Sequence, residues 1–307
     1  MFEAVFRPHT FVRVGWLLTA LAAACRRDGS HSSAAVPARA DSTRSAAPPV
    51  AATSSSAPLA SERLKEGEFG LVSADGDTIV TLALLAEPTH VKTALCVSGT
   101  YPVTHVGQHV SGDPQRAARQ VAANFASLPG QLFQITGQAR GDETCYLAAD
   151  GELIGSVIPL KHAGSSVAAT CLPAWVRALS AAQQRDVTNC WPMAAASDSI
   201  TLIAAQFAAA NDSILASIVL MDSARLFFLN FPAPYGGPDT DSRWRVDDGG
   251  VFHPEDFQIL FLAPRGGAWV MALTWAGVEG ENAYLEVSDS SRTFREVTHS
   301  YRYWVPE

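Results

Sequence analysis

The sequence predicts a β-rich protein, built mainly from antiparallel strands that pack as a sandwich or an open barrel. Short apolar runs recur about every 8–14 residues in the second half of the chain. The stretches between them are rich in Gly, Asn, Asp and Ser, and only two segments, both in the first half, have the pattern of a helix. An α+β fold is the alternative, because Ala-rich runs such as residues 199–209 also suit a helix.

The second half carries the clearer strand pattern. Its predicted strands cover residues 199–209, 213–221, 225–231, 257–263, 268–276, 283–289 and 293–304. The breakers between them include "AND", "PRGG" and "SSR", which contain the residue types that tight turns require. This spacing favours meanders of neighbouring strands.

The first half mixes strands with the two predicted helices. The strand candidates are residues 69–74, 78–85, 92–99, 131–138, 144–149, 153–160 and 166–172. Asp-Gly within "SADGDT" predicts a hairpin between the first two. One helix is predicted at 114–127, with Asp113 as N-cap and Pro114 at its first position, and the other runs from Pro173 to about Arg185.

The N-terminus has the pattern of a secretory leader. Arg7 and Arg13 precede an uncharged, mainly apolar run from Val14 to Ala24. This run is shorter than the roughly 20 residues that a membrane-spanning helix needs. Ala22-Ala23-Ala24 then supplies small residues of the kind that signal peptidases accept, so residues 1–24 are predicted to be a signal peptide.

Cys25 follows these alanines directly, and the segment resembles the lipobox of bacterial lipoproteins. The resemblance implies cleavage before Cys25, a diacylglycerol anchor on its sulfur and a location at a bacterial envelope membrane, either the outer membrane or the cell surface. The segment departs from the family in having Ala22 where leucine is favoured. Cleavage at the same bond without lipidation, which would release a soluble periplasmic protein, remains the alternative, as does a chance cysteine in an Ala-rich segment.

The other four cysteines suit two disulfides in an oxidising compartment. We favour Cys171–Cys190 together with Cys96–Cys145, because the first pair brackets a predicted helix. Four cysteines allow three connectivities, and buried free thiols are a further alternative. The spacing lacks C-x-x-C, which argues against a zinc ribbon or a redox dithiol.

Residues 25–60 are predicted to be the lipid-attachment cysteine and a disordered tether, because they are rich in Ser, Ala and Pro and nearly free of bulky apolar side chains. Residues 61–307 form the predicted globular domain, which could divide into subdomains at 61–195 and 196–307. The chain has a net charge of −8, and because residues 1–60 are basic, the domain itself carries −11. This charge disfavours nucleic acids as partners.

The sequence contains no G-x-S-x-G, S-x-x-K, H-E-x-x-H, G-x-x-x-x-G-K or G-x-G-x-x-G motif. His105 and His109 are four residues apart, but Gly107 and the neighbouring valines disfavour the helix that would let them share a metal ion. We therefore predict no metal site and no cofactor. The acidic stretch 246–256 does not have the spacing of a calcium-binding loop.

The long segment 232–256 interrupts the predicted meander, and loops of this length are usually functional or disordered. Its binding candidates mix aromatic and basic side chains, as interaction hot spots do, and are Tyr235, Arg243, Trp244, Arg245, Phe252 and His253. Alternatively, the aromatic rings fold inward and cover the edge of the core.

The resulting hypothesis is a lipid-anchored envelope protein whose domain binds an envelope protein or a glycan without catalysis. An exported hydrolase with an acid–base site near His253 is one alternative. A structural subunit of an envelope assembly is another.

Overall fold

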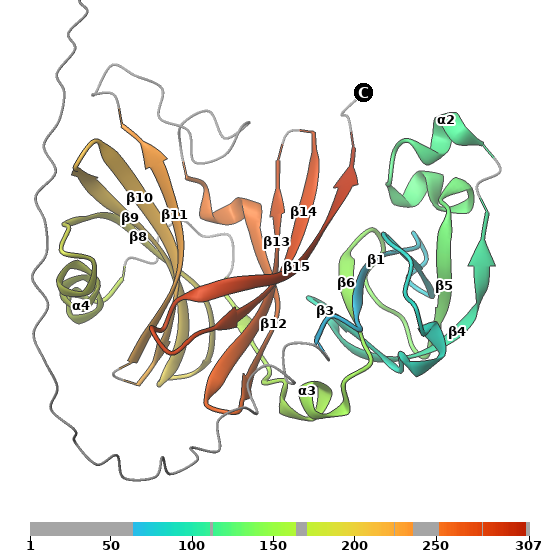
Figure 1. Ribbon diagram of the computed structural model, residues 1–307, viewed down its shortest axis with the longest axis horizontal. Helices are drawn as coiled ribbons and strands as arrows, with labels where there is room; N and C mark the ends of the chain where they lie inside the picture. The colour runs from blue at the N-terminus through green and yellow to red at the C-terminus, as the bar shows by residue number, and fades with distance from the viewer. Residues whose placement is uncertain are drawn as a thin grey trace, which may run out of the picture. The chain divides into compact units, whose positions relative to one another are not determined.

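The structure, a computed structural model, describes residues 64–110, 113–163, 171–223, 225–235, 252–277 and 279–304. The strands form a six-stranded closed barrel, a five-stranded sheet and a four-stranded sheet (Figure 1). Pairing between neighbouring strands is antiparallel in all three. The β-rich, mainly antiparallel fold predicted from the sequence is therefore confirmed, with a barrel in the first half and facing sheets in the second.

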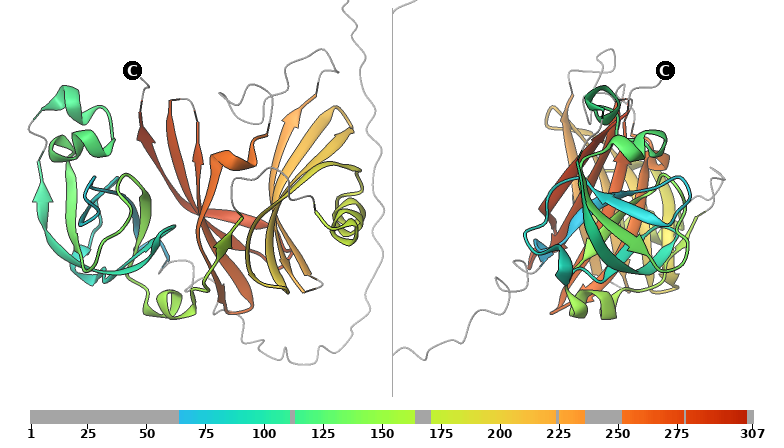
Figure 2. Two further views of the ribbon diagram at one scale, coloured as in Figure 1. Left: turned by 180° about the vertical axis from the view of Figure 1, so that it is seen from behind. Right: turned by 90° about the vertical axis from the view of Figure 1, so that its right-hand side faces the viewer.

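The barrel is closed in the order β1-β2-β5-β4-β3-β6, and the right-hand view of Figure 2 looks onto it. Its strands are β1 (Glu68–Val72), β2 (Thr78–Thr81), β3 (Thr93–Cys96), β4 (Gly99–His109), β5 (Gly130–Ile135) and β6 (Thr144–Ala148). The hairpin expected at Asp-Gly joins β1 to β2, with Gly76 at a φ of 78°. Phe133 and Leu147 are completely buried in the cluster that fills the barrel.

The two sheets hold the remaining strands. The five-stranded sheet has the order β11-β10-β9-β8-β7, and its strands are β7 (Lys161–His162), β8 (Val187–Ser197), β9 (Ile200–Ala210), β10 (Ser213–Asp222) and β11 (Arg225–Pro234). The four-stranded sheet is a simple meander of β12 (Phe257–Arg265), β13 (Ala268–Ala276), β14 (Gly280–Ser288) and β15 (Phe294–Tyr303).

The predicted turn residues make these meanders. Asn211 and Asp212 connect β9 to β10 with φ values of 52° and 55°, and Gly266 and Gly267 connect β12 to β13 with 57° and 85°. Two consecutive residues with positive φ define the type I′ turn, whose twist matches that of a hairpin. Local turn chemistry therefore sets the pairing of both hairpins.

Three short α-helices accompany the strands in the described residues: α2 (Pro114–Ala117), α3 (Gly151–Ser156) and α4 (Pro173–Gln183). Short 3-10 helices occur at η1 (Pro88–His90), η2 (Ala122–Ser127) and η3 (Pro254–Asp256). Leu179 of α4 is fully buried against Phe207 and Val219 of the five-stranded sheet. The helix thus covers the outer face of that sheet (Figure 1).

Both faces of the four-stranded sheet are buried. On one face, Met271 and Leu273 of β13 pack in a cluster with Leu202 and Ile218 of the five-stranded sheet. On the other face, Val270 and Ala272 belong to a second cluster, which also contains the barrel side chains Phe69, Leu95 and Tyr146. Alternate residues of a strand point to opposite faces, so β13 contributes to both clusters.

Two sequence predictions are wrong in the first half. Residues 153–160 do not form a strand, because Asp150 accepts hydrogen bonds from the amides of Glu152 and Leu153 and so begins the helix α3. Residues 114–127 do not form one continuous helix. Asp113 does cap its first turn.

The break in that helix has a tertiary cause. The amide of Gln120 donates to the carbonyl of Tyr303, and the side chain of Gln120 accepts from the amide of Tyr303. Val121 is extended, and the chain resumes as the 3-10 turn η2. The strands β4 and β8 were not predicted, and the strand expected at 166–172 falls mostly outside the described residues.

Both favoured disulfides are formed. Cys96–Cys145 joins neighbouring strands β3 and β6 of the barrel, with Cα atoms 4.4 Å apart. Cys171–Cys190 joins the segment before α4 to β8, with Cα atoms 5.7 Å apart. Loops of these lengths correspond to a stabilisation of about 3–4 kcal/mol each in the chain-entropy model. The pairs indicate folding in an oxidising compartment.

A buried polar network accompanies the apolar contact between the barrel and the four-stranded sheet. Arg302 of β15 is 4% exposed; its Nε donates to Glu281 Oε1 at 2.8 Å and its Nη1 to Asp142 Oδ1 at 3.0 Å. Thr144 of β6 also donates to Glu281. Each charge is therefore paired and hydrogen-bonded, as burial requires.

We expect Arg302→Ala to lower the free energy of unfolding by about 3–5 kcal/mol, because Glu281 would stay buried without its counter-ion. The matched control is Arg295→Ala on the same strand, since Arg295 Nε lies 3.3 Å from Asp289 Oδ2 but its side chain is 70% exposed. The control substitution should lower the free energy of unfolding by less than about 1 kcal/mol. Urea unfolding measures both, and equal losses would contradict the assignment.

Candidate functional site

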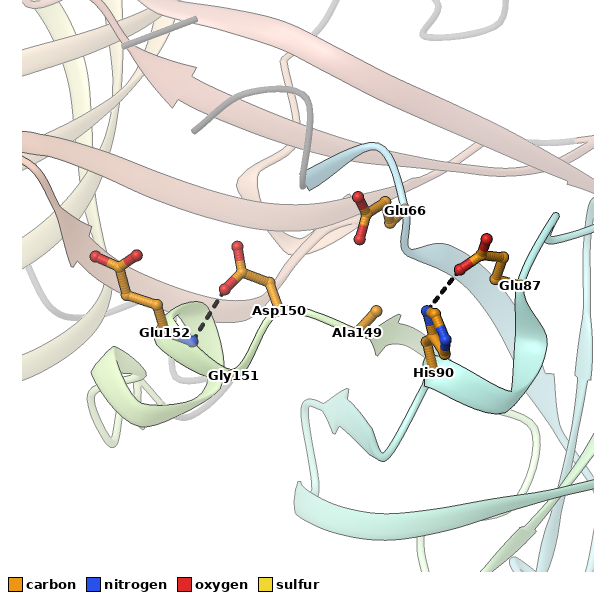
Figure 3. Close-up of a pocket in the computed structure, with 7 residues that line it drawn as sticks. All are labelled: Glu66, Glu87, His90, Ala149, Asp150, Gly151 and Glu152. Carbon is orange, nitrogen blue, oxygen red and sulfur yellow. Dashed lines mark hydrogen bonds and ion pairs between the residues drawn. The ribbon is translucent and has the colours of Figure 1, made fainter. Parts of the chain in front are cut away.

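A cavity of about 510 Å³ opens between the loop that precedes β3 and the start of α3 (Figure 3). It is lined by Glu66, Glu87, His90, Ala149, Asp150, Gly151 and Glu152. Glu66 lies just before β1, Glu87 precedes the 3-10 turn η1 and His90 ends it, and Asp150 to Glu152 begin α3. Segments distant in the sequence therefore bring four carboxylates to one cavity.

Asp150 is the buried member of this set, at 7% exposed. Its Oδ1 caps α3, and its Oδ2 lies 2.6 Å from Arg265 Nη2 at the end of β12. This contact is an ion pair rather than an aligned hydrogen bond, because Oδ2 accepts no hydrogen bond in the described part of the chain. Arg265 also approaches Glu152 Oε2, at 3.7 Å. The guanidinium thus compensates part of the negative charge of the wall.

The opposite wall is exposed. His90 Nδ1 lies 2.6 Å from Glu87 Oε2, and their side chains are 63% and 68% exposed (Figure 3). A cavity with four carboxylates and one arginine suits a cationic group better than an anion, because like charges repel. The sequence analysis did not predict this cavity. Asp-Gly at 150–151 was an available signal for a helix N-cap, but its partner Arg265 is more than a hundred residues away.

A second polar cluster lies beside the barrel disulfide. Glu143 is 4% exposed and accepts hydrogen bonds from Ser98 Oγ, the Ser98 amide and the Arg140 amide. Tyr101 donates from its hydroxyl to Ser98 Oγ at 3.0 Å. Glu143, Cys96 and Cys145 each offer a ligand atom within 4.8 Å of the others, the one such metal-ligating group in the described residues. In this structure the two sulfurs are bonded to each other in the disulfide.

The predicted binding segment is described only at its two ends. Arg243, Trp244 and Arg245 lie outside the described residues. Phe252 is 4% exposed and stacks on Phe257 with ring centroids 5.2 Å apart, so its ring folds inward and covers the core. His253 is exposed and lies 3.4 Å from Glu255 Oε1, as a surface pair.

The remaining candidates have ordinary surroundings. Tyr235 is half-buried, and its amide donates to the carbonyl of Asp212. His105 and His109 lie on β4, where His109 Nδ1 contacts the Leu128 carbonyl at 2.7 Å and the ring of His105 lies 5.3 Å from that of Phe133. The structure does not bring them together as one metal site with acidic groups.

Burial shifts the pKa of a carboxyl group and of a histidine near these regions. It raises the pKa of the Glu68 carboxyl above its ordinary value, although the hydrogen bond from Ser300 opposes the shift. It lowers the pKa of His162, and the positive charge of Arg140 acts in the same direction. Both effects disfavour the charged form of the side chain.

Among the described residues, no helix is both long and apolar enough to cross a membrane. Comparison with protein-family models, with curated proteins and with solved structures finds no match to this chain.

We expect Asp150→Asn to lower the free energy of unfolding by about 3 kcal/mol, because it keeps an oxygen that can cap α3 but leaves the guanidinium of Arg265 without its partner. Asp150→Ala removes the cap as well and should cost about 1 kcal/mol more. Glu152→Gln is the matched control, since this side chain is 71% exposed. Denaturant unfolding of the three variants checks this order, and a neutral Asp150→Asn would contradict the role given to the ion pair.

Proposed function

We propose that this chain is an exported envelope lipoprotein, held at a membrane by a lipid on Cys25, whose barrel and sheets form a binding domain. The spacer of residues 26–60 would let the domain reach away from the membrane. A flexible segment of that length has a root-mean-square span of roughly 30–35 Å.

The formation of both disulfides supports export most directly. All four cysteines of the described residues are paired, and the fifth cysteine of the sequence is Cys25. Disulfides of this kind persist in oxidising compartments, where lipoproteins of the envelope also mature. In this proposal Cys25, which follows the lipobox-like segment, carries the lipid instead of forming a bridge within the domain.

We base the proposed binding role on the volume of the cavity and on the residues that line it. The cavity of about 510 Å³ at the start of α3 falls in the range of small-molecule sites. The segment 232–256, which carries the binding candidates of the sequence analysis, is a second surface that the same binding role could use. An envelope protein or a glycan would be its partner.

The anchor is tested by substituting its attachment atom. Wild type should partition into the detergent phase of a phase-separating nonionic detergent, whereas Cys25→Ser should stay in the aqueous phase, because a thioether-linked lipid needs the sulfur. Ser32→Ala in the spacer is the matched control and should behave as wild type. Mass spectrometry of the mature N-terminus gives a second readout, and equal partitioning of wild type and Cys25→Ser would remove the anchor from the proposal.

A further inference from the structure

The barrel disulfide lies beside a buried carboxylate with the chemistry of a third metal ligand. Cys96 and Cys145 are register partners on β3 and β6, and Glu143 precedes Cys145 by two residues. Directly opposed residues of neighbouring strands point to the same face, and Glu143, one residue before β6 begins, brings its carboxylate close to the two sulfurs. Their ligand atoms lie within 4.8 Å of one another, and all three residues are buried.

The hydrogen bonds of Glu143 leave it able to bind a cation. Its Oε1 accepts from Ser98 Oγ and from the Arg140 amide, whereas among the described residues its Oε2 accepts one hydrogen bond, from the Ser98 amide at 3.2 Å. A carboxylate has about four acceptor positions, so within the described part of the chain one position on Oε2 is left for a ligand. Donors of this kind hold a carboxylate ligand in a fixed orientation, as outer-shell partners do at metal sites.

We propose that the Cys96–Cys145 disulfide is the locked form of a metal site, which opens on reduction and takes a thiophilic divalent cation such as Zn²⁺. A dithiol reductant transfers two electrons and two protons to the bridge, giving two thiols while the reductant becomes a disulfide. Zn²⁺ then displaces both protons and is held by the two thiolates and Glu143, with water in the fourth position.

Charge and context distinguish this pair from the other disulfide. Two thiolates and a carboxylate around Zn²⁺ carry a net charge of −1, and Arg140 Nη2 lies 3.7 Å from Glu143 Oε2, where it offsets that charge. Within the described residues, no third ligand atom converges on Cys171–Cys190. That pair therefore has no comparable third ligand and is removed in the test.

The test uses the full chain with Cys171→Ala and Cys190→Ala, so that Cys96–Cys145 is the one bridge of the domain. The protein is reduced with a dithiol, which is removed without oxygen, and is then titrated with Co²⁺ and Zn²⁺. We expect about one metal per chain, a sulfur-to-cobalt charge-transfer absorption, and neither in the oxidised protein. Glu143→Gln should weaken binding at least tenfold, whereas the control Glu279→Gln, at an exposed residue just before β14, should not.

The experiment tests the proposal whether or not the reduced domain stays folded. If it stays folded, Zn²⁺ must raise its melting temperature; if it unfolds, Zn²⁺ must restore the native circular dichroism. Absence of the charge-transfer absorption, equal metal binding by the oxidised protein, or unchanged affinity in Glu143→Gln would each overturn the proposal. So would a reduced, unfolded protein that Zn²⁺ fails to refold.

Discussion

The burial of the four-stranded sheet on both faces is the constraint on which the rest of the fold depends. Seven consecutive residues of β13, Trp269–Trp275, are buried, and their side chains alternate between the core shared with the five-stranded sheet and the core shared with the barrel. An antiparallel sheet usually leaves one face in water. Here most side chains on both faces of β13 are apolar, because each face packs in one of two cores.

The same constraint explains where the charged groups lie. Those that remain at the junction of barrel and sheet are paired, as Arg302 is with Glu281 and Asp142, and Arg265 with Asp150. Such pairs add little net stability relative to well-packed apolar residues, but each is costly to break. The cavity at the start of α3 lies beside one of them, the pair of Arg265 with Asp150.

Much of the fold was predictable because local signals agreed with the final packing. The continuous apolar runs of β12 and β13 identified strands, and the turn residues between them identified the hairpin. The two failures have one local and one tertiary cause. Leu153 and Ile154 look like strand residues, yet the cap at Asp150 makes them helical, and the pairing of Gln120 with Tyr303 interrupts an otherwise regular helix.

The candidate sites were predictable only in part. Cysteine spacing gave the two bridges, because a short loop around one helix can close easily. It did not give Glu143 as a neighbour of Cys96, since that contact depends on the register of β3 against β6. The cavity likewise combines Glu87 with Asp150 from separate parts of the barrel. Sequence patterns of short range cannot encode such pairs.

Native-state hydrogen exchange tests the central role of the four-stranded sheet most directly. If both cores depend on it, the amides of Val270, Met271 and Ala272 should exchange only by global unfolding, with the same free energy as those of Tyr146 and Leu147 in the barrel. Faster exchange in β13 than in β6, through an opening that leaves the barrel protected, would contradict the account.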